Sequence, residues 1–246
     1  MAIYESVNTI INDAAAEVGL TPVNDVFASA DQGFSQLRYL LDAAGRELLR
    51  MAVWAELVKE HTITTDSGDG LAGLYPLPSD WAYMIPQTNW NRTDQLPLYG
   101  PINAQDWQYL EGRSLGSASI YASFRIKNGA VAIFPNNPVP DAKTLKFEYV
   151  RNTWVTNLAG DTYYSRIQQV DDFVLYPPVL IVKFLKVKFL EAKGFDSQKA
   201  RDDFNDMLDA MIGQDKSAPV INVAGTYQGV PYLNALTNVS DTGYGA

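Results

Sequence analysis

The chain has 246 residues, of which 47% are hydrophobic, and its formal net charge at pH 7 is −9. A chain of this length and composition can form a substantial hydrophobic core. The negative charge argues against a protein that coats nucleic acid through a basic surface. The lack of cysteine excludes disulfides, thiolate catalysis and cysteine-rich zinc sites, and one histidine leaves little room for imidazole chemistry.

Two amphipathic helices are predicted before any strand. Apolar residues recur at helical spacing over residues 3–18, and a Gly followed by a Pro ends this pattern. A second, longer helix is expected to begin at a cap formed by Asp31 or Ser35 and to reach residue 55, because its apolar residues fall on one face.

A β-rich segment follows from His61, where the spacing of apolar residues changes from helical to alternating. Residues 66–70 predict a tight turn, residues 83–88 and 96–99 short strands, and residues 104–110 a brief helix. The strongest hairpin pattern spans residues 121–134 around Asn128-Gly129, since both of these residues tolerate the positive φ of a type I′ turn. Another strand is predicted at residues 144–150.

A second pair of helices is predicted after the β-rich segment. The first, at residues 177–193, begins with Pro178 in its first turn, ends at Gly194, and is apolar over more than half of its circumference. Several neighbouring elements must cover this helix, and we expect part of its apolar surface to contact another copy of the chain. Asp196 caps the next helix, which has a narrow apolar face and an acidic face opposite.

This order predicts an α+β fold in which a bundle of about four helices carries an inserted β-rich domain. The bundle would comprise residues 1–57 and 165–214. The insert would comprise residues 58–164, between the second and third helices. Residues 215–246 would form an extended C-terminal tail. The tail is rich in Gly, Asn, Thr and Pro but retains apolar residues, which favours ordering on a partner. No stretch has the length and apolar character of a membrane span or signal peptide, so no membrane partner is expected.

Three groups of residues are candidates for chemical sites. His61 has no second histidine to form a metal pair or a triad, which favours a structural role. Gly68-Asp69-Gly70 lacks the lysine of a phosphate loop and indicates a turn. Paired carboxylates beside tryptophans could bind and cleave a glycan, although such aromatics are more often core or interface residues. The residues concerned are Asp80, Asp94, Asp106, Glu111, Trp81, Trp90 and Trp107.

Charged residues on the last two helices are candidates for contacts between subunits. Three lysines lie on one side of the apolar helix, where they could contact a nucleic-acid backbone or, as we prefer, the acids of a neighbouring copy. The candidates are Lys183, Lys186, Lys193, Asp202, Asp206 and Asp209. No group of residues has the pattern of an enzyme active site, and no cofactor or metal is expected.

The order of segments resembles the head-to-tail adaptor proteins of short-tailed bacteriophages, also called tail tubular protein A. The similarity is carried by IINDA at 10–14, VGLTPV at 18–23, the helix at 37–54 that ends in Trp54, LYPLPSDW at 74–81 and LEAKGFD at 190–196. It covers most of residues 1–214 and consists of helix ends and turns, without a catalytic set.

The resemblance implies a structural adaptor in the virion, assembled in the host cytoplasm. Such proteins form a homo-oligomeric ring, usually of about twelve copies, between the portal and the tail nozzle, and double-stranded DNA passes through it without sequence recognition. Tail fibres are a further candidate partner. The C-terminal extension would reach the portal, which makes its apolar residues candidates for that contact: Val220, Ile221, Tyr227, Tyr232 and Leu233.

Two other functions remain open from the sequence. A virion-associated protein that binds or cleaves glycans would use the Trp-rich insert, and loss of sugar turnover on Asp80→Ala or Glu111→Ala would favour it. A nucleic-acid-binding module would show DNA affinity that falls with salt.

Overall fold

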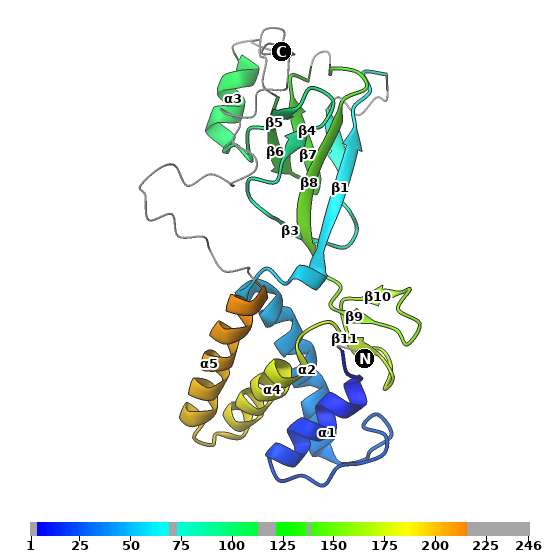
Figure 1. The fold of residues 1–246 in the computed structure, drawn as a ribbon, viewed down its shortest axis with the longest axis vertical. Coiled ribbons are helices and arrows are strands. Elements are labelled where there is room, and N and C mark those ends of the chain that lie inside the picture. Colours follow the sequence, from blue (N-terminus) through cyan, green and yellow to red (C-terminus); the bar gives the residue numbers. More distant parts are fainter. Residues whose placement is uncertain (1–3, 69–72, 113–121, 137–138, 216–246) are drawn as a thin grey trace, which may run out of the picture.

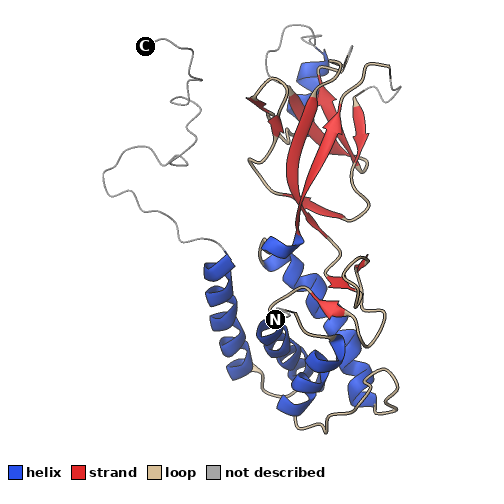
Figure 2. Ribbon diagram, turned by 45° about the vertical axis from the view of Figure 1, so that its right-hand side comes forward, coloured by secondary structure: helices blue, strands red, loops and turns tan. Residues whose placement is uncertain are grey.

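The structure, a computed structural model, describes residues 4–68, 73–112, 122–136 and 139–215. Helices α1, α2, α4 and α5 lie at one end of an elongated molecule and the larger sheets with helix α3 at the other (Figure 1). Figure 2 shows the same separation of helices and strands, with a small group of strands beside the helices. The predicted α+β class is confirmed.

The first two helices are α1 (Val7–Glu17) and α2 (Gln32–Met51). The Ser6 side chain caps α1 by accepting from the Thr9 backbone N–H, so the helix begins later than the predicted residue 3. Residue 6 also forms an isolated β-bridge with Phe173, which draws the preceding backbone into an extended conformation. The predicted cap at Asp31 is confirmed, because its carboxylate accepts from the Gly33 backbone N–H at 2.7 Å.

Helix α4 (Pro178–Lys193) lies between its neighbours and contacts α1, α2 and α5 (Gln198–Asp215). Gly194 ends α4 in the left-handed conformation, with φ of 73°, as the sequence predicted. The rings of Phe184 on α4 and Phe204 on α5 stack with centroids 4.4 Å apart. The chain itself buries seven residues of α4: Leu180, Ile181, Val182, Phe184, Leu185, Val187 and Phe189.

The expectation that part of the apolar surface of α4 contacts another copy stays a prediction. Contacts from three helices of the same chain enclose its apolar surface, and only the first turn leaves a large apolar side chain exposed, at Val179. A contact between copies through the apolar surface of α4 would therefore involve Val179.

The main sheet has the order β1-β8-β4-β5, and β3 also pairs with β8. Strand β1 follows α2 through a short 3-10 turn, η1 (Ala55–Leu57), and runs antiparallel to β8 over its full length. The strands are β1 (Val58–Thr64), β3 (Trp81–Met84), β4 (Trp90–Asn91), β5 (Leu96–Pro97) and β8 (Thr144–Arg151). The strand predicted at 83–88 thus lies earlier, and the one at 96–99 is shorter.

A second sheet has the order β2-β7-β6, with β2 (Leu74–Pro76), β6 (Ser123–Lys127) and β7 (Ala130–Phe134). The predicted hairpin between β6 and β7 is confirmed: Asn128 has φ of 52° and Gly129 has φ of 68°, as a type I′ turn requires. Helix α3 (Ala104–Gly112) matches the brief helix predicted there. The turn expected at residues 66–70 lies partly outside the described residues.

A third, small sheet packs with the helices. It has the order β10-β9-β11, with β9 (Val155–Thr156), β10 (Tyr163–Tyr164) and β11 (Phe173–Val174). Just before it, the fully buried Trp154 contacts α2 so closely that a Cβ at Gly45 would lie 2.4 Å from its ring. The Tyr176 hydroxyl donates to the Gly45 carbonyl at 2.8 Å, so α2 is bound to the segment that leads into α4.

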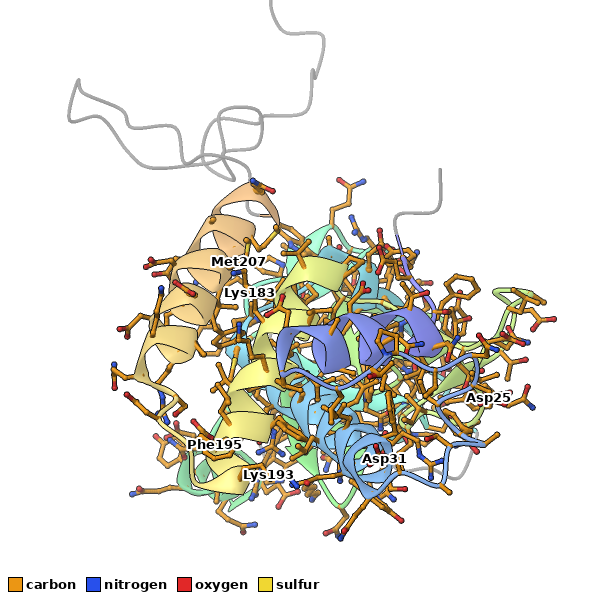
Figure 3. All side chains as sticks on the ribbon, turned by 90° about the horizontal axis from the view of Figure 1, so that it is seen from below. Asp25, Asp31, Lys183, Lys193, Phe195 and Met207 are labelled. Atoms are coloured by element: carbon orange, nitrogen blue, oxygen red, sulfur yellow. The ribbon has the colours of Figure 1, made fainter. Side chains whose placement is uncertain are left out.

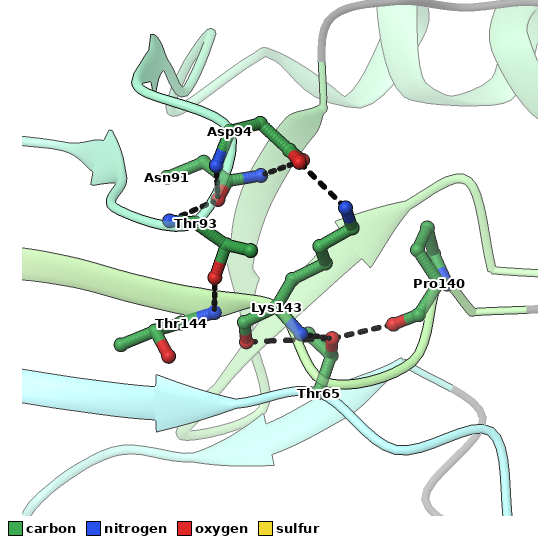
Figure 4. A network of polar contacts seen from close by, with 7 residues as sticks. All are labelled: Thr65, Asn91, Thr93, Asp94, Pro140, Lys143 and Thr144. Carbon is green, nitrogen blue, oxygen red and sulfur yellow. Dashed lines mark hydrogen bonds and ion pairs between the residues drawn. The ribbon is translucent and has the colours of Figure 1, made fainter.

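Polar contacts fix the end of the main sheet that lies away from the helices (Figure 4). The buried Thr65 hydroxyl donates to the Pro140 carbonyl at 2.5 Å and accepts from the Lys143 backbone N–H at 3.0 Å. The Lys143 ammonium lies 2.6 Å from Asp94, whose other oxygen accepts from the Asn91 amide at 2.8 Å. These bonds hold the ends of β1, β4 and β8 together.

Candidate functional site

Two of the three candidate lysines of α4 have partners within their own chain. Lys186 forms an ion pair of 3.0 Å with Glu17 on α1, and the ammonium of Lys193 lies 5.3 Å from the centre of the Phe189 ring. Lys183, labelled on α4 in Figure 3, is half-buried. The ion pair uses the charge of Lys186 to join α4 to α1, which leaves less of that charge for another molecule.

The three acids of α5 are placed differently. Asp202, Asp206 and Asp209 are exposed on the side opposite Phe204, the α5 residue that is buried against α4. Asp202 accepts a bond of 2.9 Å from the Gln198 amide one turn earlier. Within the described ranges, no ion pair joins these acids to the α4 lysines. The acidic face of α5 is therefore open to solvent.

Helix α2 carries an outward face that the sequence analysis did not single out. Tyr39 is 73% exposed, and Arg46 and Arg50 are exposed on the same side of the helix. At 100° per residue these three positions lie opposite the buried Leu41 and Leu48. Their spacing of seven and four residues was the signal in the sequence that could have revealed this face.

The proposed portal-binding residues, Val220, Ile221, Tyr227, Tyr232 and Leu233, lie outside the described residues.

The carboxylates considered for glycan cleavage are bound by separate groups. Asp80 accepts from the Lys59 ammonium at 2.7 Å and from the Tyr149 hydroxyl at 2.8 Å. Burial works to raise the pKa of Asp80, but these two hydrogen bonds and the Lys59 charge outweigh it and hold the pKa below its usual range. In the same way, the bond from Lys143 lowers the pKa of Asp94.

The other two carboxylates lie near α3. Asp106 accepts from the Asn103 amide at 2.8 Å, and Glu111 is 3.4 Å from the Gln108 amide. A glycosidase needs a carboxylic acid whose pKa is raised so that it can protonate the leaving oxygen. The lowered pKa values of Asp80 and Asp94 disfavour that role for both of them.

Of the three tryptophans considered for glycan binding, two are packing residues. Trp107 is 1% exposed against Phe134, and Trp81 stacks on Tyr149 with ring centroids 5.5 Å apart. The third, Trp90, lines an open pocket of about 550 Å³ together with Asn89, Tyr99, Asn103 and Asp106.

His61 is part of the sheet and packs on aromatic rings. It lies on β1, 5.3 Å from the Phe147 ring centroid and 6.3 Å from that of Tyr149. Burial lowers the pKa of His61, while the negative charge of Asp80 opposes this effect. Throughout the described ranges, no cluster of three His, Asp or Glu side chains has the arrangement of a metal site.

None of the described helices is long and apolar enough to cross a membrane. Among curated proteins, none matches this sequence. A family model described as SU10 adaptor protein matches residues 5–228, which is most of the chain. The protein therefore belongs to the SU10 adaptor protein family and is a structural adaptor protein of a bacteriophage virion.

Proposed function

We propose that the protein forms a homo-oligomeric ring, of about twelve copies, that connects the portal to the tail nozzle and lets double-stranded DNA pass. The observation that carries this proposal is the match to an adaptor family over residues 5–228. The exposed charged faces of α2 and α5 support it, because an adaptor must present surfaces to its neighbours. The net charge of −9 suits a channel that does not retain phosphates.

The finer assignment is to the tail tubular protein A type, in which the C-terminal extension binds the portal through the five apolar residues named above. Assembly would take place in the host cytoplasm. Contacts between copies would involve the acids of α5 and the charged residues of α4, with tail fibres as further partners. Of the α4 residues, the exposed Lys193 is better placed for this than Lys186, which pairs with Glu17.

Imaging of the purified protein by electron microscopy, with and without portal, tests the proposal. We expect closed rings or, if the portal templates assembly, rings that form only on the portal. A matched variant that ends at Asp215 should keep the helical fold and lose portal binding. Mass measurements that give only monomers, together with a failure to bind portal, would contradict the proposal.

Glycan binding by the insert is the second candidate function. The pocket beside β4 supports it, because Trp90 and the 73% exposed Tyr99 can stack on a sugar ring while Asn103 and Asp106 offer polar groups. Binding to host surface glycans that is lost on Tyr99→Ala and kept on Tyr109→Ala, an exposed tyrosine outside the pocket lining, would favour it. Sugar turnover that is lost on Asp106→Ala would indicate cleavage as well as binding, since Asp106 lines this pocket.

A further inference from the structure

The helical part presents two exposed helix faces of opposite charge. On α2, the basic face consists of Tyr39, Arg46 and Arg50. The acids nearest to it on α2 are already engaged: Glu47 pairs with Lys188 at 2.6 Å, and the Asp42 carboxylate accepts from the Ile167 backbone N–H. The two arginines therefore dominate the charge of this face.

On α5, the acidic face consists of Asp202, Asp206 and Asp209, all exposed. Lys199 stands at the beginning of this face, and Arg201 is turned away from it to bind Glu191 at the end of α4. The face therefore keeps an excess of negative charge along two turns of the helix.

Within the described part of one chain, no ion pair joins the two faces. Helix α5 packs on α4, and α4 in turn packs on α2, so α4 separates the two outer helices. Figures 1 and 3 show α5 on one outer side of the helical part, with α4 between it and α2. The basic and acidic faces thus do not pair with each other in the described part of one chain, but they can pair between copies related by rotation about a ring axis.

We propose that the α2 face of each copy binds the α5 face of the next copy around the ring. This inference rests on the proposed ring and specifies its interface. The two arginines of α2 are then the main basic partner of the α5 acids, because Lys186 of α4 is held by Glu17 of its own chain. Lys193 of α4 is left as an additional partner. Complementary charge directs the approach and the register of the two helices, and Tyr39 provides an exposed aromatic anchor.

Charge reversal with rescue tests this interface in the full-length protein. The double variant Arg46→Glu, Arg50→Glu should weaken assembly at least tenfold by mass photometry, and so should Asp202→Arg, Asp206→Arg. All four positions are exposed, so circular dichroism should show an unchanged fold. Mixing the two double variants should restore alternating contacts, and a chain that carries all four changes should form rings again.

Arg92→Glu is the matched control, since Arg92 is exposed in the β-rich part and far from both faces along the chain. It should assemble like the wild-type protein. Wild-type rings together with normal rings for both double variants would overturn this interface and leave the proposed function standing. A wild-type protein that forms no ring, even with portal, would overturn both. Loss of assembly without rescue in the fourfold variant would also overturn the pairing of the two faces.

Discussion

The helical part and the β-rich part are stabilised in different ways. Among the described residues, the helical cluster contains 28 buried apolar residues, while the main cluster of the β-rich part contains nine. The β-rich part adds polar bonds at its edges, such as those of Thr65 and of Asp80. The helical part can therefore lose surface charges without unfolding, whereas the β-rich part depends on individual hydrogen bonds.

The largest effect is expected for Phe184→Asp in the helical cluster. Phe184 is 5% exposed and stacks on Phe204, so the change buries an unpaired carboxylate and removes the ring contact. We expect a loss of about 4 kcal/mol or more in the free energy of unfolding. Urea denaturation followed by circular dichroism measures it. Phe195→Asp, at a residue that is 63% exposed, is the control and should change the free energy of unfolding little. Equal losses in the two variants would contradict the dependence of the helical part on its buried apolar cluster.

A second variant tests the junction between α2 and the small sheet. A Cβ at Gly45 would lie 2.4 to 2.6 Å from three ring atoms of the buried Trp154, so Gly45→Ala forces the two elements apart. We expect a net destabilisation of about 2 kcal/mol, even though alanine favours the helix by about 1 kcal/mol. Gly213→Ala on α5 meets no atom within 4 Å and should stabilise the protein slightly. Thermal denaturation of both variants measures the two effects separately, because Gly213→Ala changes helix propensity alone and Gly45→Ala adds the steric clash.

Thr65→Val examines a polar bond of the β-rich part. The change keeps the shape of the side chain and removes the hydroxyl that donates to Pro140, which leaves that carbonyl without its partner. The expected cost is about 1–2 kcal/mol. Thr62→Val, at an exposed residue of strand β1, which ends just before Thr65, should cost almost nothing. If both variants unfold at the same urea concentration, the β-rich part does not depend on this bond.

The smallest change in stability is expected on replacing Asp80, and this change depends on pH. Because its folded pKa lies below the ordinary value, the carboxylate contributes stability above that ordinary pKa and loses the contribution as pH falls through the folded pKa. At pH 7 we expect Asp80→Asn to be less stable by about 1 kcal/mol, through weaker bonds to Lys59 and Tyr149. Urea denaturation between pH 7 and pH 3 should show the two proteins converging in acid; a constant difference would contradict the role of the charge.

The local elements were the parts most readily predicted from the sequence. The cap at Asp31, the stop at Gly194 and the Asn128-Gly129 hairpin each depend on the conformational preferences of a few adjacent residues, and all three were found. The first helix began four residues later than predicted, because its extended entry is set by a bridge to residue 173. Strand ends in the Pro-rich segment were also misplaced, since pairing to β8 decides those of β3 and pairing to β4 decides those of β5.

The sequence by itself determined the α+β class, the order of helices and strands, and the central, apolar character of α4, because periodicity and turn chemistry act over neighbouring residues. The tertiary structure alone decided which charged side chains are paired within the chain and which remain available to another molecule. It brought Glu17 to Lys186 and Glu47 to Lys188, and it turned Arg46 and Arg50 outward. Helical spacing shows that two residues share a face, but only the packing of helices distant in the chain decides whether that face meets a partner or solvent.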